Sequence, residues 1–156
     1  MLKNAKNVGH GVSGESERSE IEPSTIAAFK ETQYRVDATA PFVLRIDEAC
    51  TELAYHFKKA RVDSCAYITA VNPFSEQLDK VKNAERQATL ERELKRRGLS
   101  YILGIGQHPN NQWPGEPSFL VLGLSLEAAK VMGRKHEQDA LVWCGSDMVA
   151  RLILLR

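Results

Sequence analysis

Residues 99–124, LSYILGIGQHPNNQWPGEPSFLVLGL, decide how the rest of the chain is interpreted. Two apolar segments in it, LSYILGIG and SFLVLGL, are typical of strands, and the connection between them holds His108, Trp113 and Glu116. Compact domains keep a connection this long and irregular when it binds something or is disordered. We therefore expect a loop over 104–118, and we expect this loop to be the working surface of the protein.

The elements around this loop predict the class of fold. Residues 40–47, APFVLRID, alternate like a half-buried strand, and residues 64–71, SCAYITAV, are apolar on both faces like a central strand. Residues 140–144 and 149–155 are expected to close the domain as a hairpin. Three helices are expected, each after its capping residue: 48–60 after Asp47, 80–97 after Asp79, and 126–136 after Ser125. This order favours one α+β domain, with three main helices packed on a mixed or antiparallel sheet of about five or six strands.

Length and composition are those of one globular domain. The chain has 156 residues, of which 43% are hydrophobic and 26% are charged. Residues 1–24 hold almost no large apolar side chains, so we expect a flexible tail there and a single domain over 25–156. The 21 Lys and Arg residues against 20 Asp and Glu residues leave a net charge of +1. No overall field is therefore available to attract nucleic acid or an anionic membrane.

Several kinds of location and site are disfavoured by the sequence. The first residues contain no apolar run of secretory length and no later segment approaches a membrane span, which predicts a cytoplasmic protein without a membrane partner. Cys50, Cys65 and Cys144 lie far apart in apolar sequence, so we expect reduced core residues rather than a metal site. Gly104 and Gly106 are not followed by a helix start, so no nucleotide cofactor is expected.

The long helix expected over 80–97 carries two amides on its apolar stripe. Asn83 and Gln87 fall on the same side as Leu90 and Leu94, because successive residues of a helix are about 100° apart. Two interpretations stay open. The amides either bond to backbone carbonyls of the preceding loop or face a pocket beside the Asn-Pro-Phe turn.

The connection over 104–118 contains a candidate pair for acid–base chemistry. Pro109 holds the preceding His108 in an extended or turn conformation, which fixes its direction. With Glu116 on the far side of Trp113, a histidine and a carboxylate could act together if the loop folds back on itself. The alternative is an exposed loop histidine, with Trp113 packed as a lid on the core.

The end of the long helix is basic. Four basic residues lie on its last turns: Arg92, Lys95, Arg96 and Arg97. Cations suit the carboxyl end of a helix, and the interspersed Glu91 and Glu93 indicate a solvated face. A nucleic-acid partner is therefore not expected.

Five motifs in this order resemble a bacterial protein family, the domain of unknown function DUF3293. They are YITAVNPFS, NAERQATLERELKRRGL, GQHP, WPGEPSFLVLGL and EQDALVWCG. The resemblance spans about residues 34–155 and implies a bacterial cytoplasmic protein, but no activity, cofactor or catalytic residue. The polar and turn positions of the family pattern are Thr69, Asn72, Pro73, Asn83, Arg86, Gln107, His108, Pro109, Glu116 and Gln138.

These positions predict a cleft formed by the 69–75 turn, the start of the 80–97 helix and the 104–118 loop. Its amides, histidine, arginine and glutamate suit a polar small molecule or a nucleotide-like ligand. The residues expected to bind it are Thr69, Asn72, Asn83, Arg86, Gln87, Gln107, His108, Trp113 and Glu116. Two alternatives stay open: a protein-interaction or regulatory module that docks a partner through the Trp113 loop, and a nucleic-acid accessory factor. Whether the protein is an enzyme is left open as well.

Overall fold

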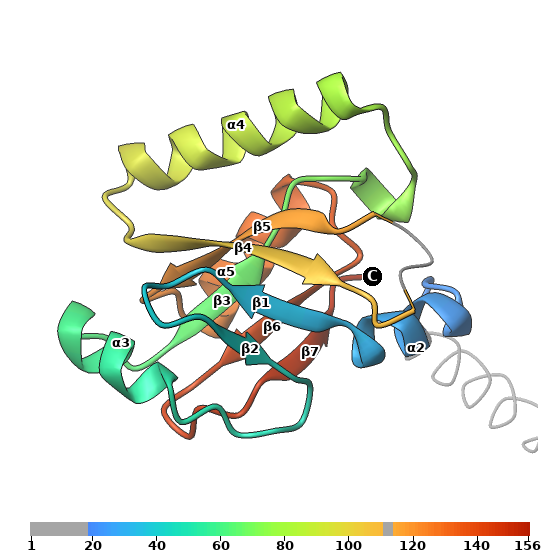
Figure 1. The fold of residues 1–156 in the computed structure, drawn as a ribbon. Helices are drawn as coiled ribbons and strands as arrows, with labels where there is room; N and C mark the ends of the chain where they lie inside the picture. The colour runs from blue at the N-terminus through green and yellow to red at the C-terminus, as the bar shows by residue number, and fades with distance from the viewer. Residues whose placement is uncertain (1–18, 111–113) are drawn as a thin grey trace, which may run out of the picture.

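Seven strands form one antiparallel sheet, which curls into a half-barrel (Figure 1). The computed structural model describes residues 19–110 and 114–156, and every count below refers to these residues. The strands lie in the order β2-β1-β4-β5-β3-β6-β7. Their bounds are β1 Gln33–Val36, β2 Phe42–Leu44, β3 Cys65–Ile68, β4 Tyr101–Gln107, β5 Glu116–Leu122, β6 Ala140–Cys144 and β7 Arg151–Leu154.

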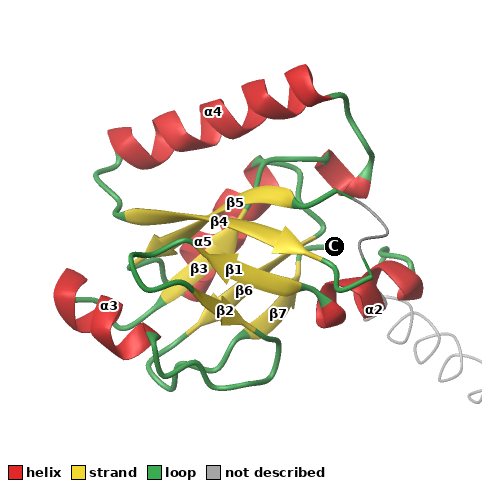
Figure 2. Ribbon diagram, in the orientation of Figure 1, coloured by secondary structure: helices red, strands yellow, loops and turns green. Residues whose placement is uncertain are grey.

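Four α-helices and one short 3-10 turn surround this sheet (Figure 2). They are α2 Pro23–Glu31, α3 Leu53–Ala60, η1 Pro73–Ser75, α4 Lys80–Arg96 and α5 Leu126–Lys135. The predicted α+β class is confirmed, but the sheet has one strand more and the fold one helix more than expected. The additional strand, β1, has only four residues, and the additional helix, α2, buries none of its side chains. Elements this short leave little periodic signal in a sequence.

Each face of the sheet carries its own core. On the concave face, β-strand side chains such as Leu44 and Leu120 pack with Leu53 of α3. On the outer face, α4 and α5 cover the sheet, with Leu94 and Met132 in the buried cluster. All four residues of β3 are buried, as expected for a strand that is covered on both faces. Figure 1 shows α3 and α2 at opposite ends of the half-barrel.

Helix caps and the last hairpin agree with the sequence prediction. The Asp79 side chain accepts a hydrogen bond from Lys82 N at 2.8 Å, and Ser125 caps α5 in the same way. β6 and β7 pair as an antiparallel hairpin. The three cysteines, Cys50, Cys65 and Cys144, are buried and free of disulfides, as predicted. None of the described helices is long and apolar enough to cross a membrane.

The helix predicted over 48–60 begins later than expected, which corrects the role given to Asp47. α3 starts at Leu53, and Asp47 adopts a left-handed backbone (φ 67°) instead of capping a helix. The backbone before α3 bonds to the loop before β7, as in the 3.2 Å bond from Ala150 N to the Glu48 carbonyl, which a helix over 48–60 would use itself. Because this pairing uses the groups that a first helical turn would need, the helix cannot begin earlier.

The loop predicted over 104–118 is shorter than expected. β4 continues through Gln107 and β5 begins at Glu116, so both ends of the segment, 104–107 and 116–118, are strands of a β-hairpin in which Gly106 is paired with Glu116. The two glycines of β4 and Pro117 weaken the strand signal in the sequence. Trp113 lies outside the described residues. The predicted tail over 1–24 also lies mostly outside them, although Ile21 is buried and α2 begins at Pro23.

Candidate functional site

The concave face of the half-barrel ends in a cavity of about 590 Å³ beside α2. We call it the concave pocket. Strands β1, β3, β4 and β5 contribute to it, together with the turn after β3 and the start of β6. Its polar side chains include Glu31, Tyr34, Tyr67, Thr69, Asn72, Ser75, His108, Glu116, Ser118, Gln138 and Asp139. Its volume is that of a small-molecule site, for which roughly 300–1,000 Å³ is usual.

The alternation of β5 builds the polar end of the concave face. Leu120 and Leu122 belong to the concave core. Glu116 and Ser118 come before them in the chain and lie on the same side of the strand. The face therefore changes along the strand from apolar core to polar pocket. Ser118 lines the cavity, whereas Leu120, two residues later in the chain, packs in the core.

Two glycines of β4 lie opposite these pocket residues. Gly104 is paired with Ser118, and Gly106 with Glu116. A Cβ on Gly104 would lie 2.2 Å from Arg35 O and 2.7 Å from the Tyr67 hydroxyl, so only glycine fits there. A Cβ on Gly106 would lie 3.7 Å from Thr32 and 3.8 Å from Tyr34, which are ordinary van der Waals contacts.

Glu116 is the most unusual group of the pocket. Among the residues that the structure describes, its carboxylate has one hydrogen-bond partner, Asn72, whose Nδ2 donates to Oε2 at 2.7 Å. Burial raises the pKa of Glu116, and the hydrogen bond from Asn72 offsets only part of this shift. A carboxyl group in this state can bind a hydrogen-bond donor or hold and release a proton.

The turn that presents Asn72 has a strained backbone. Asn72, Phe74 and Ser75 all have positive φ angles, of 50°, 52° and 62°. Each such residue costs about 1–3 kcal/mol and persists where its surroundings hold it. The turn is held by the bond from Phe74 N to Glu137 O at 2.6 Å, and by the bond from the Ser75 hydroxyl to Asp139 at 2.6 Å. Strain of this kind is common at binding and catalytic sites.

The two amides of α4 hold the same turn from the outer side. Asn83 Oδ1 accepts from Asn72 N at 2.9 Å, and its Nδ2 donates to Asn72 Oδ1 at 2.8 Å. Gln87 accepts from Ala70 N at 2.9 Å and donates to Pro117 O at 3.0 Å. The same carbonyl of Pro117 lies 2.7 Å from the Thr69 hydroxyl. These amides therefore position Asn72 and the end of β3.

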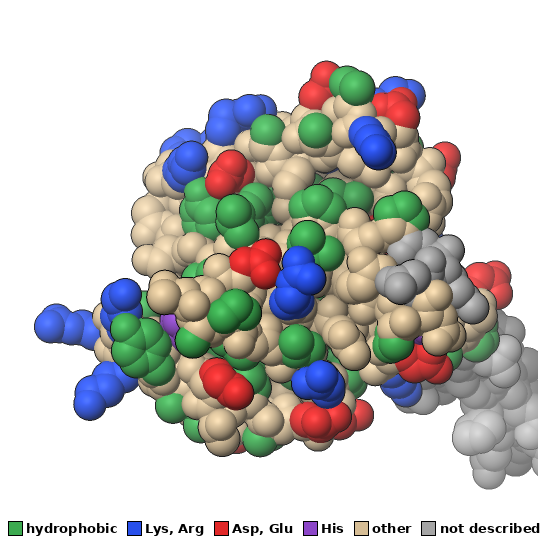
Figure 3. Space-filling view, in the orientation of Figure 1, with side chains coloured by type: hydrophobic (Ala, Val, Ile, Leu, Met, Phe, Trp, Pro, Cys, Tyr) green, Lys and Arg blue, Asp and Glu red, His purple; other side chains and the backbone are tan. Residues whose placement is uncertain are grey.

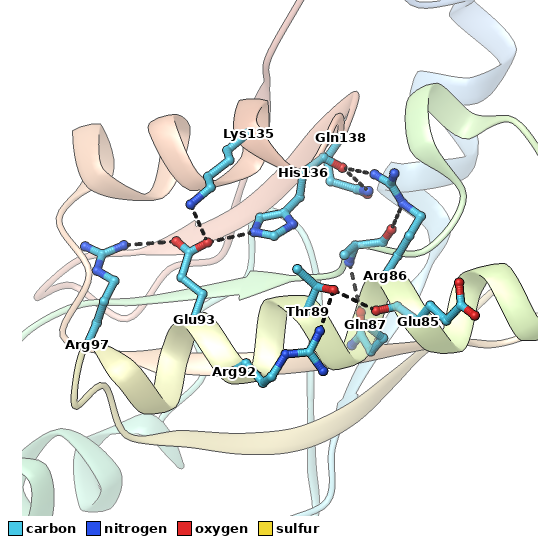
Figure 4. Close-up of polar contacts among 11 residues, drawn as sticks. Glu85, Arg86, Gln87, Thr89, Arg92, Glu93, Arg97, Lys135, His136 and Gln138 are labelled. Atoms are coloured by element: carbon cyan, nitrogen blue, oxygen red, sulfur yellow. Dashed lines mark hydrogen bonds and ion pairs between the residues drawn. The ribbon is translucent and has the colours of Figure 1, made fainter.

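Arg86 connects the same turn to the end of α5 (Figure 4). Its Nε donates to Ala70 O at 2.7 Å and its Nη2 to His136 O at 2.8 Å. Its Nη1 lies 3.4 Å from the carboxylate of Glu137. The guanidinium is thus bonded to groups of the protein itself and acts as a clamp between two loops.

His108 joins the pocket to α2. It is buried, with 3% of its surface exposed, and its Nε2 lies 2.8 Å from the carboxylate of Glu31. Its Nδ1 accepts from Asn110 N at 3.2 Å, which assigns the proton to Nε2 in the neutral ring. His108 and Glu116 both line the pocket, but the carboxylate bonded to His108 is that of Glu31.

A second cavity, of about 610 Å³, lies beside the first half of α4 and shares Asn72, Gln77 and Glu116 with the concave pocket. The binding residues predicted from the sequence are divided between the two cavities: Asn83 and Gln87 line the second, Thr69 and His108 line the concave pocket, and Asn72 and Glu116 line both. Arg86 and Gln107 line neither cavity. Among the described residues, no group of three or more His, Cys, Asp or Glu side chains is placed to hold a metal ion.

Sequence reasoning missed the members of the pocket that come from α2, β1, the second half of the hairpin at β5 and the loop before β6. Glu31, Tyr34, Ser118 and Asp139 line the cavity but were not among the predicted binding residues. The alternation of Glu116 and Ser118 before an apolar strand was a usable signal. Nothing in the local sequence signals that α2 or β6 lies at the same end of the sheet.

One comparison with known proteins gives a partial match to a family model, and none gives an activity. A family model described as "Protein of unknown function (DUF3293)" matches residues 68–141, which supports the resemblance noted in the sequence. The match covers the strained turn, α4, the β4–β5 hairpin and α5. No curated protein and no solved structure matches the chain.

Proposed function

We propose, for a chain whose residues 68–141 match the DUF3293 family, that the concave pocket binds a small polar molecule through Glu116. One observation carries the proposal. The Glu116 carboxyl borders a cavity, its pKa is raised by burial, and it has no cationic partner among the described residues. Such a carboxyl lowers the stability of the folded protein, so it is expected where a ligand or a reaction uses it.

The lining of the pocket favours one of the two kinds of ligand expected from the sequence. Within 19–110 and 114–156, no Lys or Arg side chain lines the cavity, whereas Glu31, Glu116 and Asp139 do. The phosphate of a nucleotide-like ligand would meet carboxylates without a cation to balance it. A polar molecule without phosphate fits this lining better.

A fragment screen tests the proposal. The purified full chain is screened by thermal shift and by NMR against a library of small polar molecules, together with Glu116→Gln. Glu127→Gln, an exposed carboxyl on α5, is the matched control. Ligands near saturation are expected to raise the Tm by several degrees, to lose this effect in Glu116→Gln and to keep it in Glu127→Gln. Hits that Glu116→Gln leaves unchanged, or the absence of any hit, contradict the proposal.

The other two candidate functions stay predictions. The interaction surface was predicted around Trp113, which lies outside the described residues. For nucleic acid, the basic end of α4 is the candidate, but Arg97 is 3.5 Å from Glu93 and Arg92 bonds to Thr89. Figure 3 shows Lys and Arg side chains separated from one another and mixed with acidic ones on the face drawn. A steep salt dependence of binding to nucleic acid would be needed to support that role.

A further inference from the structure

We infer that the ligand of the concave pocket carries a positively charged nitrogen, which binds between the Glu116 carboxylate and the rings of Tyr34 and Tyr67. The inference rests on the proposed function, because it names the chemical class of ligand for that pocket. It follows from the charges that line the cavity, from the aromatic surface beside Glu116, and from the partners that the other polar groups already have.

The pocket contains one carboxylate that is shielded from water and has no cation beside it among the described residues. The Glu31 side chain is 62% exposed to water and accepts from His108 Nε2 at 2.8 Å, and Asp139 is paired with Arg156 at 2.5 Å. Glu116 is bonded only to the neutral amide of Asn72 within the described part of the chain. A carboxylate removed from water without a cation is costly, and a ligand cation would relieve that cost.

Two tyrosine rings form the aromatic surface of the same pocket. Tyr34 and Tyr67 meet edge to face, with ring centroids 5.3 Å apart and planes at 73°. Their hydroxyls donate to backbone carbonyls, Tyr34 to Phe29 at 2.6 Å and Tyr67 to Arg35 at 2.8 Å. The hydroxyl protons are therefore already used, and the rings are what these residues offer to a ligand. The face of a tyrosine ring attracts a cation.

Tyr34 and Glu116 are near enough to act on one ligand. Burial raises the pKa of Tyr34, and the negative charge of Glu116 adds to this rise. Their strands are both paired with β4, where Gly106 is opposite Tyr34 on one side and Glu116 on the other. Because Gly106 has no side chain, nothing from β4 fills the space between the tyrosine ring and the carboxylate. A carboxylate beside aromatic rings is a common way to bind an ammonium or amidinium group.

Three compounds that share one ring and differ in charge test the inference: benzylammonium, benzyl alcohol and benzoate. The full chain is labelled with ¹⁵N and titrated with each compound. We expect benzylammonium to shift the amide signals of Tyr67, Glu116 and Ser118 and to bind roughly tenfold more tightly than benzyl alcohol. Benzoate is expected to leave these signals unchanged.

Variants separate charge from shape in this test. Glu116→Gln keeps the size of the side chain and should remove the preference for benzylammonium over benzyl alcohol, while Glu127→Gln should keep it. Tyr34→Leu should weaken benzylammonium more than benzyl alcohol, because only the cation gains from the ring face.

The outcomes distinguish the inference from the proposed function. Tighter binding of benzyl alcohol or benzoate at the same amides would overturn the inference and leave the pocket as a binding site. If none of the three compounds shifts these amides, the inference is wrong, and the proposed function then depends on the fragment screen alone. A preference for benzylammonium that Glu116→Gln retains would also overturn the inference.

Discussion

Glu93 and Glu116 are two shielded carboxyls with opposite roles. Glu93 accepts from Lys135 at 2.9 Å and lies 3.1 Å from His136 Nε2, between α4 and α5 (Figure 4). Burial alone would raise the pKa of Glu93, but Lys135 and His136 lower it by more. Burial raises the pKa of Glu116, which lacks such partners in the described chain. Glu93 therefore stabilises the fold near neutral pH, whereas Glu116 weakens it.

This contrast predicts opposite effects of two isosteric substitutions on stability. At pH 7, Glu93→Gln should lower the free energy of unfolding by about 1–3 kcal/mol, because Lys135 and His136 lose a charged partner. Glu116→Gln should leave it unchanged or raise it. Chemical denaturation of both variants beside the natural chain measures the two effects. A large loss in Glu116→Gln would show that its carboxylate is structural.

The pH dependence should differ in sign as well. Folded Glu116 binds its proton more tightly than unfolded Glu116, so stability falls as the pH rises from the unfolded pKa to the raised folded pKa. For Glu93 the unfolded chain binds the proton more tightly, so stability falls as the pH falls through the lowered pKa. Glu116→Gln should remove the first dependence and Glu93→Gln the second.

Gly104 and Gly106 of β4 offer a second pair of matched substitutions. Gly104→Ala should destabilise the protein by about 1–3 kcal/mol, because its Cβ would collide with the Arg35 carbonyl, which belongs to the backbone. Gly106→Ala should change stability by less than about 1 kcal/mol, since its Cβ would make only ordinary contacts. Thermal unfolding of both variants checks the difference. Equal losses of stability in the two variants would mean that the close contact between Gly104 and the Arg35 carbonyl does not exclude a side chain.

At the scale of elements, Arg86 holds two loops together, and this structural role must be separated from any role in ligand binding. Arg86→Ala should cost about 2–3 kcal/mol, because two carbonyls of different loops lose a charged donor. Arg92→Ala, an exposed arginine on the same helix, should cost less than about 0.5 kcal/mol. Urea denaturation measures both. Similar stability of both variants would contradict the clamp. A loss of ligand binding in Arg86→Ala is evidence for a binding role only if the variant is shown to be folded.

α2 should behave as a cover whose end is held by the hydrogen bond between His108 and Glu31. It buries no side chain, and its end is held by the contact of Glu31 with His108. Glu31→Gln should speed hydrogen exchange of amides in α2 by roughly fivefold, which corresponds to about 1 kcal/mol, without changing exchange in β3. Exchange measured by NMR or mass spectrometry tests this. Unchanged rates in α2 would mean that other contacts hold the helix.

Elements with local signals were predictable and elements made by distant pairing were not. Asp79 and Ser125 cap their helices as the sequence predicts, because a cap depends on neighbouring residues only. Asp47 failed as a cap because the backbone after it bonds to residues near Ala150. Both strands of the β4–β5 hairpin were predicted, but their ends next to the loop were masked by residues that are poor in strands, although these residues fit the register of this hairpin.

At the scale of the whole molecule, the two cores should unfold together. β3 and β5 bury side chains on both faces, so losing either core exposes the strands that support the other. In a Trp113→Phe chain, Trp143 fluorescence reports on the outer core, and the NMR signals of the Tyr67 ring report on the concave core. Their denaturation midpoints should coincide. Separate midpoints would mean that the faces are independent units.

The order of strands explains why the candidate site was only partly predictable. The sequence indicates Asn72 and Glu116 as pocket residues, since each follows or begins an apolar strand. Their contact arises because β3 is paired with β5, and Asp139 joins them because β6 is paired with β3. These pairings connect residues far apart in sequence, and no local pattern encodes them.

The change from core to pocket along β5 separates two kinds of selection within one strand. The choice of residue at Leu120 and Leu122 is constrained by packing in the core. The choice at Glu116 and Ser118 is constrained by the ligand proposed for the cavity. Mutations at the pocket end of β5 can therefore alter the specificity of the proposed binding site while the concave core stays intact. A combinatorial library confined to Glu116, Ser118 and Gly106 would sample new ligands on an unchanged scaffold.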